Sequence, residues 1–146
     1  MKTFIFFLLI FVTAQTSAQI ITKTVAADGS GDYRTVQEAL DAVPQKNKKN
    51  INIKIKNGVY KEKLFLDSTK NFVSLIGEDK FNTILTYNDH TGKVSPKGDV
   101  INTRTSWSFK ILADNFTASN ITFQNDAGFT AGQAVAVECE DRKSVV

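Results

Sequence analysis

Short apolar segments recur along this chain at nearly regular distances, and they restrict its fold more than any other feature. In the clearest one, Ile51, Ile53 and Ile55 alternate with Asn52 and Lys54, which places the apolar side chains on one face of a strand. Further short segments of this kind occupy residues 63–66, 72–76, 83–87, 109–111, 120–123 and 134–137. The sequence therefore predicts an all-β protein built from many short strands.

The distance between these segments narrows the choice of architecture. The first four apolar segments are centred on Ile53, Phe65, Leu75 and Leu85. These centres lie 12, 10 and 10 residues apart. Such spacing is typical of a β-sandwich, a barrel or a solenoid. Asp-Gly and Asn-Gly, the dipeptides that favour tight hairpins, occur only at 28–29 and 57–58. Most turns are therefore not tight hairpins. The pattern favours a parallel β-solenoid, with a sandwich as the alternative.

One helix is predicted over residues 33–43, ahead of all these strands. Thr35 and Glu38 have the spacing of a capping box, and Pro44 stops the helix. An apolar stripe at helical spacing is formed by Val36, Ala39, Leu40 and Val43. A helix in this position could cover the open N-terminal end of a solenoid.

The N-terminal segment has the features of a secretory signal peptide. Lys2 precedes an unbroken apolar run at 4–12, and small residues lead up to Ala18. The run is too short to cross a bilayer, which takes about 20 residues. We therefore predict a signal peptide at 1–18, cleavage after Ala18, and a secreted, extracellular or periplasmic chain of residues 19–146.

Composition excludes several kinds of site. A net charge of +3 without a long basic block argues against a dedicated nucleic-acid-binding protein. A single cysteine and a single histidine form neither an internal disulfide nor a zinc site, and Cys139 is expected to be a buried apolar residue. His90 lacks a G-x-S-x-G motif to support a serine hydrolase, and residues 28–32 lack the closing glutamate of a calcium loop.

One polar residue stands out as a candidate binding group. Gln133 follows a glycine-containing loop at the start of an apolar strand, where a neutral amide can donate a hydrogen bond to a substrate oxygen. The alternative is that Gln133 merely ends a turn. Two glycosylation sequons, at 115–117 and 120–122, are interpreted as strand and turn residues.

Several motifs in order resemble the pectinesterase (pectin methylesterase) family. They are V-A-x-D-G-S-G-D-Y-x-T-V-Q-E-A-L at 25–40, G-V-Y-x-E at 58–62, L-I-G-E at 75–78, N-I-T-F-Q-N-x-A-G at 120–128 and G-Q-A-V-A-V at 132–137. Thr103 and Ser106 match positions that we expect in a strand before the fourth motif. The resemblance covers the N-terminal half of the family's catalytic domain.

The resemblance implies a right-handed parallel β-helix with an N-terminal capping helix and an aspartyl esterase that hydrolyses methyl esters of polygalacturonate. It implies pectin as the partner, no cofactor or metal, no nucleic acid, no membrane, and a monomer when complete. In the family, one aspartate attacks the ester, a second acts as acid and base, and an arginine positions the nucleophile. Two substrate-binding positions match this sequence, Thr103 and Gln133.

The catalytic positions of the family do not match this chain. It contains no Gln-Asp pair, and Asp126 and Asp141 fit neither aspartate. We therefore expect both aspartates and the arginine beyond Val146, and we interpret the chain as a truncated, inactive fragment. The alternatives are another sugar-active β-helix enzyme, such as a lyase or polygalacturonase, and a non-catalytic secreted solenoid that binds polysaccharide.

Overall fold

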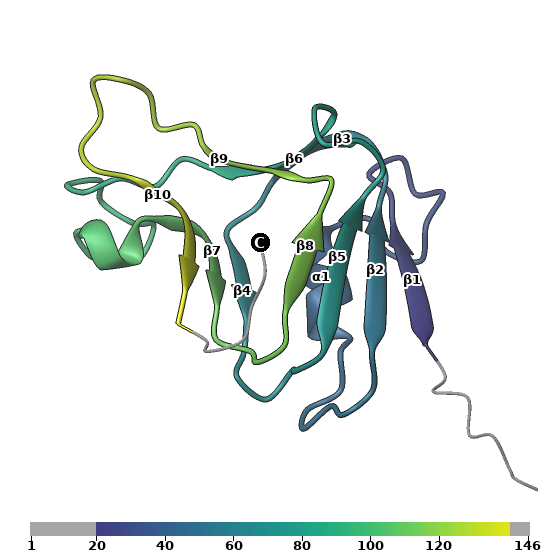
Figure 1. The fold of residues 1–146 in the computed structure, drawn as a ribbon. Helices are drawn as coiled ribbons and strands as arrows, with labels where there is room; N and C mark the ends of the chain where they lie inside the picture. The colour runs from purple at the N-terminus through teal and green to yellow at the C-terminus, as the bar shows by residue number, and fades with distance from the viewer. Residues whose placement is uncertain (1–19, 141–146) are drawn as a thin grey trace, which may run out of the picture.

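The computed structural model describes residues 20–140, in which ten strands form three sheets (Figure 1). The first sheet contains, in spatial order, β1 (Ile21–Val25), β2 (Ile51–Ile55), β5 (Val73–Gly77) and β8 (Thr117–Ser119). The second contains β3 (Gly58–Lys61), β6 (Thr83–Tyr87) and β9 (Thr122–Asn125). The third contains β4 (Leu64–Leu66), β7 (Trp107–Ile111) and β10 (Val135–Cys139).

Every pair of neighbouring strands in these sheets is parallel. The chain visits the three sheets in turn, so that β2, β3 and β4 make one coil, β5, β6 and β7 the next, and β8, β9 and β10 the third. The predicted parallel β-helix is confirmed, and the sandwich alternative is wrong. The segments recur every 10 residues or so because each marks one strand, whereas a full coil takes three strands.

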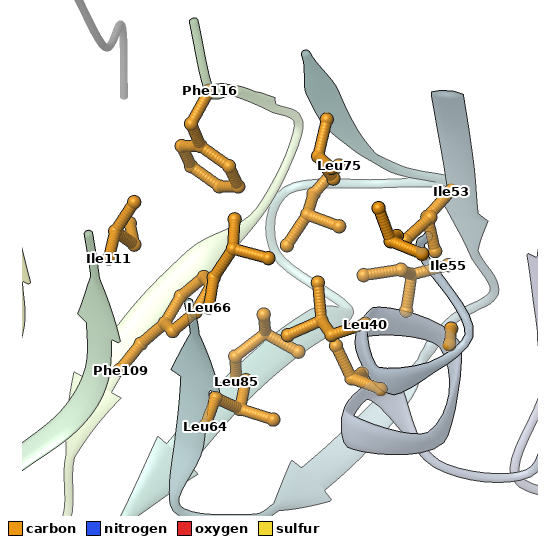
Figure 2. Close-up of a cluster of buried hydrophobic side chains, with 14 of the residues drawn as sticks. Leu40, Ile53, Ile55, Leu64, Leu66, Leu75, Leu85, Phe109, Ile111 and Phe116 are labelled. Carbon is orange, nitrogen blue, oxygen red and sulfur yellow. The ribbon is translucent and has the colours of Figure 1, made fainter. Parts of the chain in front are cut away.

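The interior is filled by columns of apolar side chains that stack from coil to coil. Leu64 pairs in register with Phe109, and Leu66 with Ile111; all four side chains are buried. Figure 2 shows these side chains meeting Leu40 from the helix in one continuous cluster. Burial of apolar surface is the main force that holds such a stack together.

The helix α1 (Val36–Asp41) lies within the predicted range of 33–43 but is shorter at both ends, and its predicted capping box is present. Thr35 and Glu38 form the capping box, with the Thr35 side chain accepting from the Glu38 backbone N–H. The helix stops at its C-cap, Ala42, two residues before the proline. The Glu62 carboxylate accepts from the backbone N–H groups of Val36 and Gln37, which fixes the N-terminus of the helix to the first full coil.

The same helix protects the edge of the third sheet. β4 is one of the two edge strands of that sheet, at its N-terminal end, and α1 packs against it. The Gln37 side chain accepts from the Phe65 backbone N–H at 2.8 Å and donates to the Phe65 carbonyl at 3.1 Å. Gln37 thus makes the two hydrogen bonds that another strand would make, so α1 caps the N-terminal end of the β-helix as predicted.

Several expectations from the sequence differ from the structure. β1, β3 and β8 were not predicted as strands, and residues 57–58 indicated only a turn. Thr103 lies in a single 3-10 turn, η1 (Thr103–Thr105), and not in a strand, because the Asn102 side chain caps that turn. Cys139 is exposed and not buried, since it lies on the outermost described coil.

Some expectations fall outside the described residues. The predicted signal peptide at 1–18 and Asp141 both belong to this group. Within residues 20–140, no helix is long and apolar enough to cross a membrane.

Candidate functional site

Two long loops form the candidate site. One joins β6 to β7 and contains η1, and the other joins β9 to β10; both extend from the same side of the coil stack (Figure 1). The first loop carries Thr103 and the second carries Gln133, and both residues are exposed. Consecutive coils therefore bring together two residues that are 30 positions apart in the sequence.

The hydroxyl of Thr103 donates to Oε1 of Gln133 at 3.0 Å. The hydroxyl of Thr91 lies 3.1 Å from that of Thr103. Because the single Thr103 proton is used on Gln133, Thr91 is the donor of this second bond. The carbonyl end of the Gln133 amide is thereby held in place, while the side chain as a whole is exposed.

The backbone holds Gln133 in the same position. Its carbonyl oxygen accepts from the Thr91 backbone N–H at 2.8 Å. This approach depends on Gly132, because a Cβ at position 132 would lie 2.3 Å from the Thr91 carbonyl oxygen. Glycine therefore lets the second loop lie directly on the first.

Asn125, at the end of β9, links the two loops. Its side-chain NH2 lies 2.8 Å from the carbonyl oxygen of Asp89, 3.0 Å from that of Ser106 and 3.3 Å from that of Val135. These carbonyls belong to the start of the first loop, the end of that loop and the first residue of β10. One amide thus sets the relative position of the segments that carry Thr103 and Gln133.

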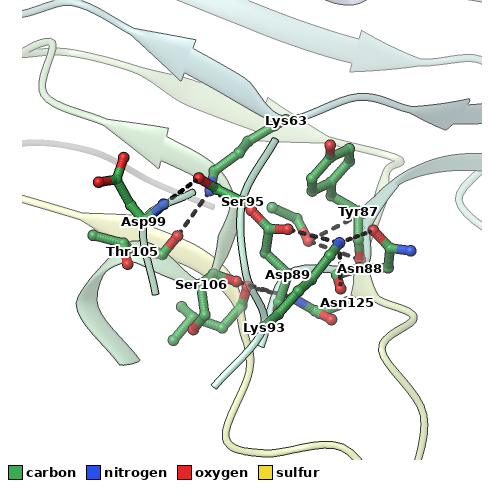
Figure 3. A network of polar contacts seen from close by, with 12 residues as sticks. Lys63, Tyr87, Asn88, Asp89, Lys93, Ser95, Asp99, Thr105, Ser106 and Asn125 are labelled. Atoms are coloured by element: carbon green, nitrogen blue, oxygen red, sulfur yellow. Dashed lines mark hydrogen bonds and ion pairs between the residues drawn. The ribbon is translucent and has the colours of Figure 1, made fainter. Parts of the chain in front are cut away.

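Asp89 is a buried acid beside this link (Figure 3). Its carboxylate accepts from Nζ of Lys63 and forms an ion pair of 2.9 Å with Nζ of Lys93. Burial alone would raise the pKa of Asp89, but the hydrogen bonds from the two lysines outweigh it and hold the pKa below its usual value. Asp89 is therefore ionised at neutral pH and fastens the first loop to the start of β4.

The sequence anticipated only part of this arrangement. Thr103 and Gln133 came from the resemblance, and the structure brings them into contact. Asn125 was noted among the motif residues but not as a link, and Thr91 and Asp89 were missed. The abundance of asparagine at strand ends was the available signal for Asn125, whereas no local pattern distinguishes Thr91 or Asp89 from other loop residues.

Other sequence-based candidates do not join the site chemically. Nδ1 of His90 lies 3.1 Å from the Thr91 carbonyl oxygen, a contact that involves no acid or nucleophile. Asp126 forms an exposed ion pair of 2.9 Å with Lys61. Across residues 20–140, no three His, Cys, Asp or Glu side chains are grouped so as to hold a metal ion.

Comparison with known proteins identifies the family. The protein family described as Pectinesterase matches residues 22–146 of this chain. A pectinesterase of Petunia integrifolia is 42% identical over 123 residues, and pectinesterase 31 of Arabidopsis thaliana is 37% identical over 117 residues. These alignments cover 84% and 77% of this chain, but only 31% and 37% of the two relatives.

Solved structures agree with this assignment. A pectin methylesterase from carrot superposes with a TM-score of 0.76 at 34% identity, covering 91% of this chain and 39% of the carrot chain. One from Erwinia chrysanthemi gives a TM-score of 0.72 at 25% identity, covering 90% of this chain and 42% of the other. This chain thus spans less than half the length of these relatives, and within that span it belongs to the pectinesterase family.

Proposed function

We propose that this chain forms the substrate-holding part of a pectinesterase, which hydrolyses methyl esters of polygalacturonate and releases methanol. Membership of the family supports the reaction class, a carboxylic ester hydrolysis. Structural neighbours described as pectin methylesterases were crystallised in complexes with hexasaccharides. These complexes support a pectin chain as the ligand of the site between the two loops.

The observation that carries the proposal is the contact between Thr103 and Gln133. With its Oε1 bonded to Thr103, the exposed Gln133 side chain would use its NH2 group to donate to a ligand. A donor in a fixed orientation stabilises the negative charge that develops on an ester carbonyl oxygen during attack. Thr103 and Gln133 would then bind the sugar next to the reacting ester, and Gln133 would polarise its carbonyl.

Residues 1–146 supply no group that matches the nucleophile, the acid and base, or the positioning arginine of the family. Ester hydrolysis by this mechanism needs all three, and losing such a unit typically costs more than about 10³-fold in rate. We therefore expect the chain to bind methyl-esterified oligogalacturonides without hydrolysing them.

Methanol release from highly methylated pectin tests the absence of turnover, and calorimetric titration with a methyl-esterified oligogalacturonide tests binding. Gln133→Ala should weaken that binding, whereas Gln45→Ala, which removes an exposed amide ahead of β2, should not. Saturable methanol release that Gln133→Ala abolishes would contradict the proposal and make Asp126 and Asp141 candidate nucleophiles. Equal binding by both variants would reduce Gln133 to a structural role.

A complete pectinesterase that contains this segment gives a kinetic test of the same residue. There, Gln133→Ala should lower kcat by about 10²-fold if the amide stabilises the oxyanion. Unchanged kcat and KM would contradict a role for this amide in the reaction.

We also propose that the chain is exported, on the basis of the residues that lead up to Ala18. Signal peptidase cleavage would leave Gln19 as the first residue of the mature protein. Intact mass spectrometry of secreted material measures this directly. Exported protein that retains Met1 would contradict the proposed signal peptide.

A further inference from the structure

A second cavity lies at the turns that precede β2 and β5, away from the candidate site. These turns run along the lower edge of the molecule in Figure 1, whereas the loops that carry Thr103 and Gln133 extend to the left. The cavity has a volume of about 600 Å³, within the range of about 300–1,000 Å³ that is usual for small-molecule sites. One phenylalanine, two lysines and four uncharged polar residues line it.

The phenylalanine, Phe72, has an unfavourable backbone conformation. Its φ is 61°, in the left-handed region that a bulky side chain rarely adopts. Asn115 occupies the same place in the next coil, two residues before Thr117, which pairs with Ser74. Its φ is 57°, and asparagine is one of the few residues that tolerate this region. Phe72 therefore stands where the turn itself favours asparagine.

Core packing does not explain the phenylalanine at this position. Within residues 20–140, Phe72 is not a member of the apolar cluster that fills the interior. Its side chain is half-buried and lines the cavity instead. Strained residues of this kind are concentrated at functional sites. The ring thus provides an apolar surface for a ligand in the cavity.

Lys46 and Lys48 give the cavity its charge. Both residues are exposed, and neither ammonium group forms an ion pair with an acid of residues 20–140. The lining contains these two lysines and no acid, so its net charge is +2. The carboxylate of nearby Asp67 already accepts from the Thr69 backbone N–H at 2.8 Å and from its hydroxyl at 2.6 Å. The cavity therefore attracts an anion.

Asn47 fixes the two walls of the cavity to each other. Its buried side-chain NH2 donates to the carbonyl oxygen of Lys49 at 2.7 Å and to that of Asn71 at 2.6 Å. Its backbone N–H donates to the Thr69 carbonyl at 3.3 Å. The turn with the lysines and the turn with Phe72 are thus joined in advance, which lowers the entropic cost of binding.

We propose that this cavity is a second carbohydrate-binding site, which takes a uronate residue of an acidic polysaccharide. The Phe72 ring would pack against the apolar C–H face of the sugar, and Lys46 and Lys48 would donate to its carboxylate. The choice of polymer rests on the proposed function, because ester hydrolysis turns methyl-esterified polygalacturonate into a polymer of free uronates. The cavity would hold that de-esterified polymer at a distance from Thr103 and Gln133.

Calorimetric titration of the chain with de-esterified trigalacturonate measures this binding. We expect saturable binding at low salt that weakens as the salt concentration rises, because the lysines are exposed. A neutral galactose trimer should bind much more weakly, since it lacks the carboxylates.

Variants of the ring test the contact with the sugar. Phe72→Leu removes the ring but keeps apolar bulk, and it should raise the dissociation constant of trigalacturonate by about 3- to 10-fold. Phe72→Trp, which keeps an aromatic ring, should retain binding. Phe81→Leu is the matched control, because Phe81 is an exposed phenylalanine on another turn, with Nζ of Lys80 4.9 Å from its ring centre.

Charge variants test the contact with the carboxylate. Lys46→Gln and Lys48→Gln should each raise the dissociation constant by about 2- to 5-fold, the range for one exposed ion pair. Lys80→Gln is the matched control and should have little effect.

Phe72→Asn separates binding from folding. Asparagine suits the left-handed backbone of this turn, so the thermal midpoint of this variant should be no lower than that of the unaltered chain. Its affinity for trigalacturonate should nevertheless fall as it does in Phe72→Leu. A lower midpoint would show that Phe72 serves the fold and would overturn the proposal.

Three further outcomes would overturn it: no saturable binding of trigalacturonate, equal binding of the neutral trimer, or effects at positions 46, 48 and 72 no larger than those at 80 and 81. Gln133→Ala separates this proposal from the proposed function, because it should lose affinity for the methyl ester and still bind trigalacturonate in the cavity. Loss of cavity binding alone leaves the esterase proposal standing. Loss of Gln133-dependent ester binding alone leaves the cavity as a uronate site and removes the basis for the esterase proposal.

Discussion

Asp89 illustrates how single residues in this chain depend on partners that are distant in sequence. Its side chain is 7% exposed, and it keeps its charge because Lys63 and Lys93 approach from two different segments. An unpaired carboxylate in this position would be unfavourable. The stability of the first loop is thus coupled to the ionisation of one acid.

Replacing this acid gives a pH-dependent test. Asp89→Asn should lower the free energy of unfolding at pH 7 by about 1.5–3 kcal/mol, the range for hydrogen bonds to charged groups. Because the pKa of Asp89 is lowered in the folded protein, its contribution is fully present above the ordinary value of 3.8 and is lost as pH falls through the lower folded value. The difference between the two proteins should therefore disappear in strong acid.

Urea unfolding at a series of pH values, followed by circular dichroism, measures this difference. Asp126→Asn is the matched control, since Asp126 also pairs with a lysine but at an exposed position. Exposed pairs contribute at most about 1 kcal/mol. A loss at Asp89 no larger than that at Asp126, or one that does not depend on pH, would contradict the assignment.

At the scale of elements, α1 takes the place of a further strand beside β4, in the first full coil. Gln37 bonds to the backbone of β4, and Lys70 donates at 3.0 Å and 2.9 Å to the carbonyls of Leu40 and Asp41 at the end of the helix. Leu40 fills the interior behind this contact and is fully buried. The helix therefore closes the edge of the sheet and the apolar interior together.

Substitutions at Leu40 test this role. Leu40→Ala should cost about 2–5 kcal/mol through the cavity it leaves, and Leu40→Asp should cost more, because it places an unpaired charge in the interior. Ala42→Asp adds the same group at the exposed C-cap and should cost no more than about 1 kcal/mol. Chemical denaturation compares the three variants, and similar losses at positions 40 and 42 would show that the helix does not close the interior.

The whole molecule is a stack, so each coil must fit closely on the one before. Gly77, on β5, shows how close this fit is. A Cβ on it would lie 2.0 Å from the carbonyl oxygen of Asn120, in the turn between β8 and β9 of the third coil. No side chain could be accommodated there unless the two coils moved apart.

Gly77→Ala should therefore destabilise the protein by about 1–3 kcal/mol or more, as overpacking does in other cores. Gly58→Ala is the matched control, because the nearest atoms to its Cβ belong to the Tyr60 side chain at 3.3 Å and beyond. That variant should stay within about 1 kcal/mol of the unaltered protein. Thermal unfolding distinguishes the two, and equal midpoints would contradict close contact between the second and third coils.

The sequence alone determined the elements whose signals are local. The alternation of Ile51, Ile53 and Ile55 is enough to predict β2, and the spacing of Thr35 and Glu38 is enough to predict where α1 begins. Both signals arise from neighbouring residues, through side-chain direction in a strand and hydrogen bonding at a helix start. The resemblance to pectinesterases then supplied Thr103 and Gln133.

Only the tertiary structure decided which strands pair and which loops meet. Paired residues are from 22 positions apart, as for Ile51 with Val73, to 45, as for Leu64 with Phe109. β8 pairs in parallel with β5, a neighbour 43 positions earlier in the chain that a local pattern does not reveal. Asn125 and Asp89 acquire their roles in the same way. Stacking of the coils brings Asn125 to the Asp89 carbonyl and Asp89 to Lys63, and each of these partners comes from another coil.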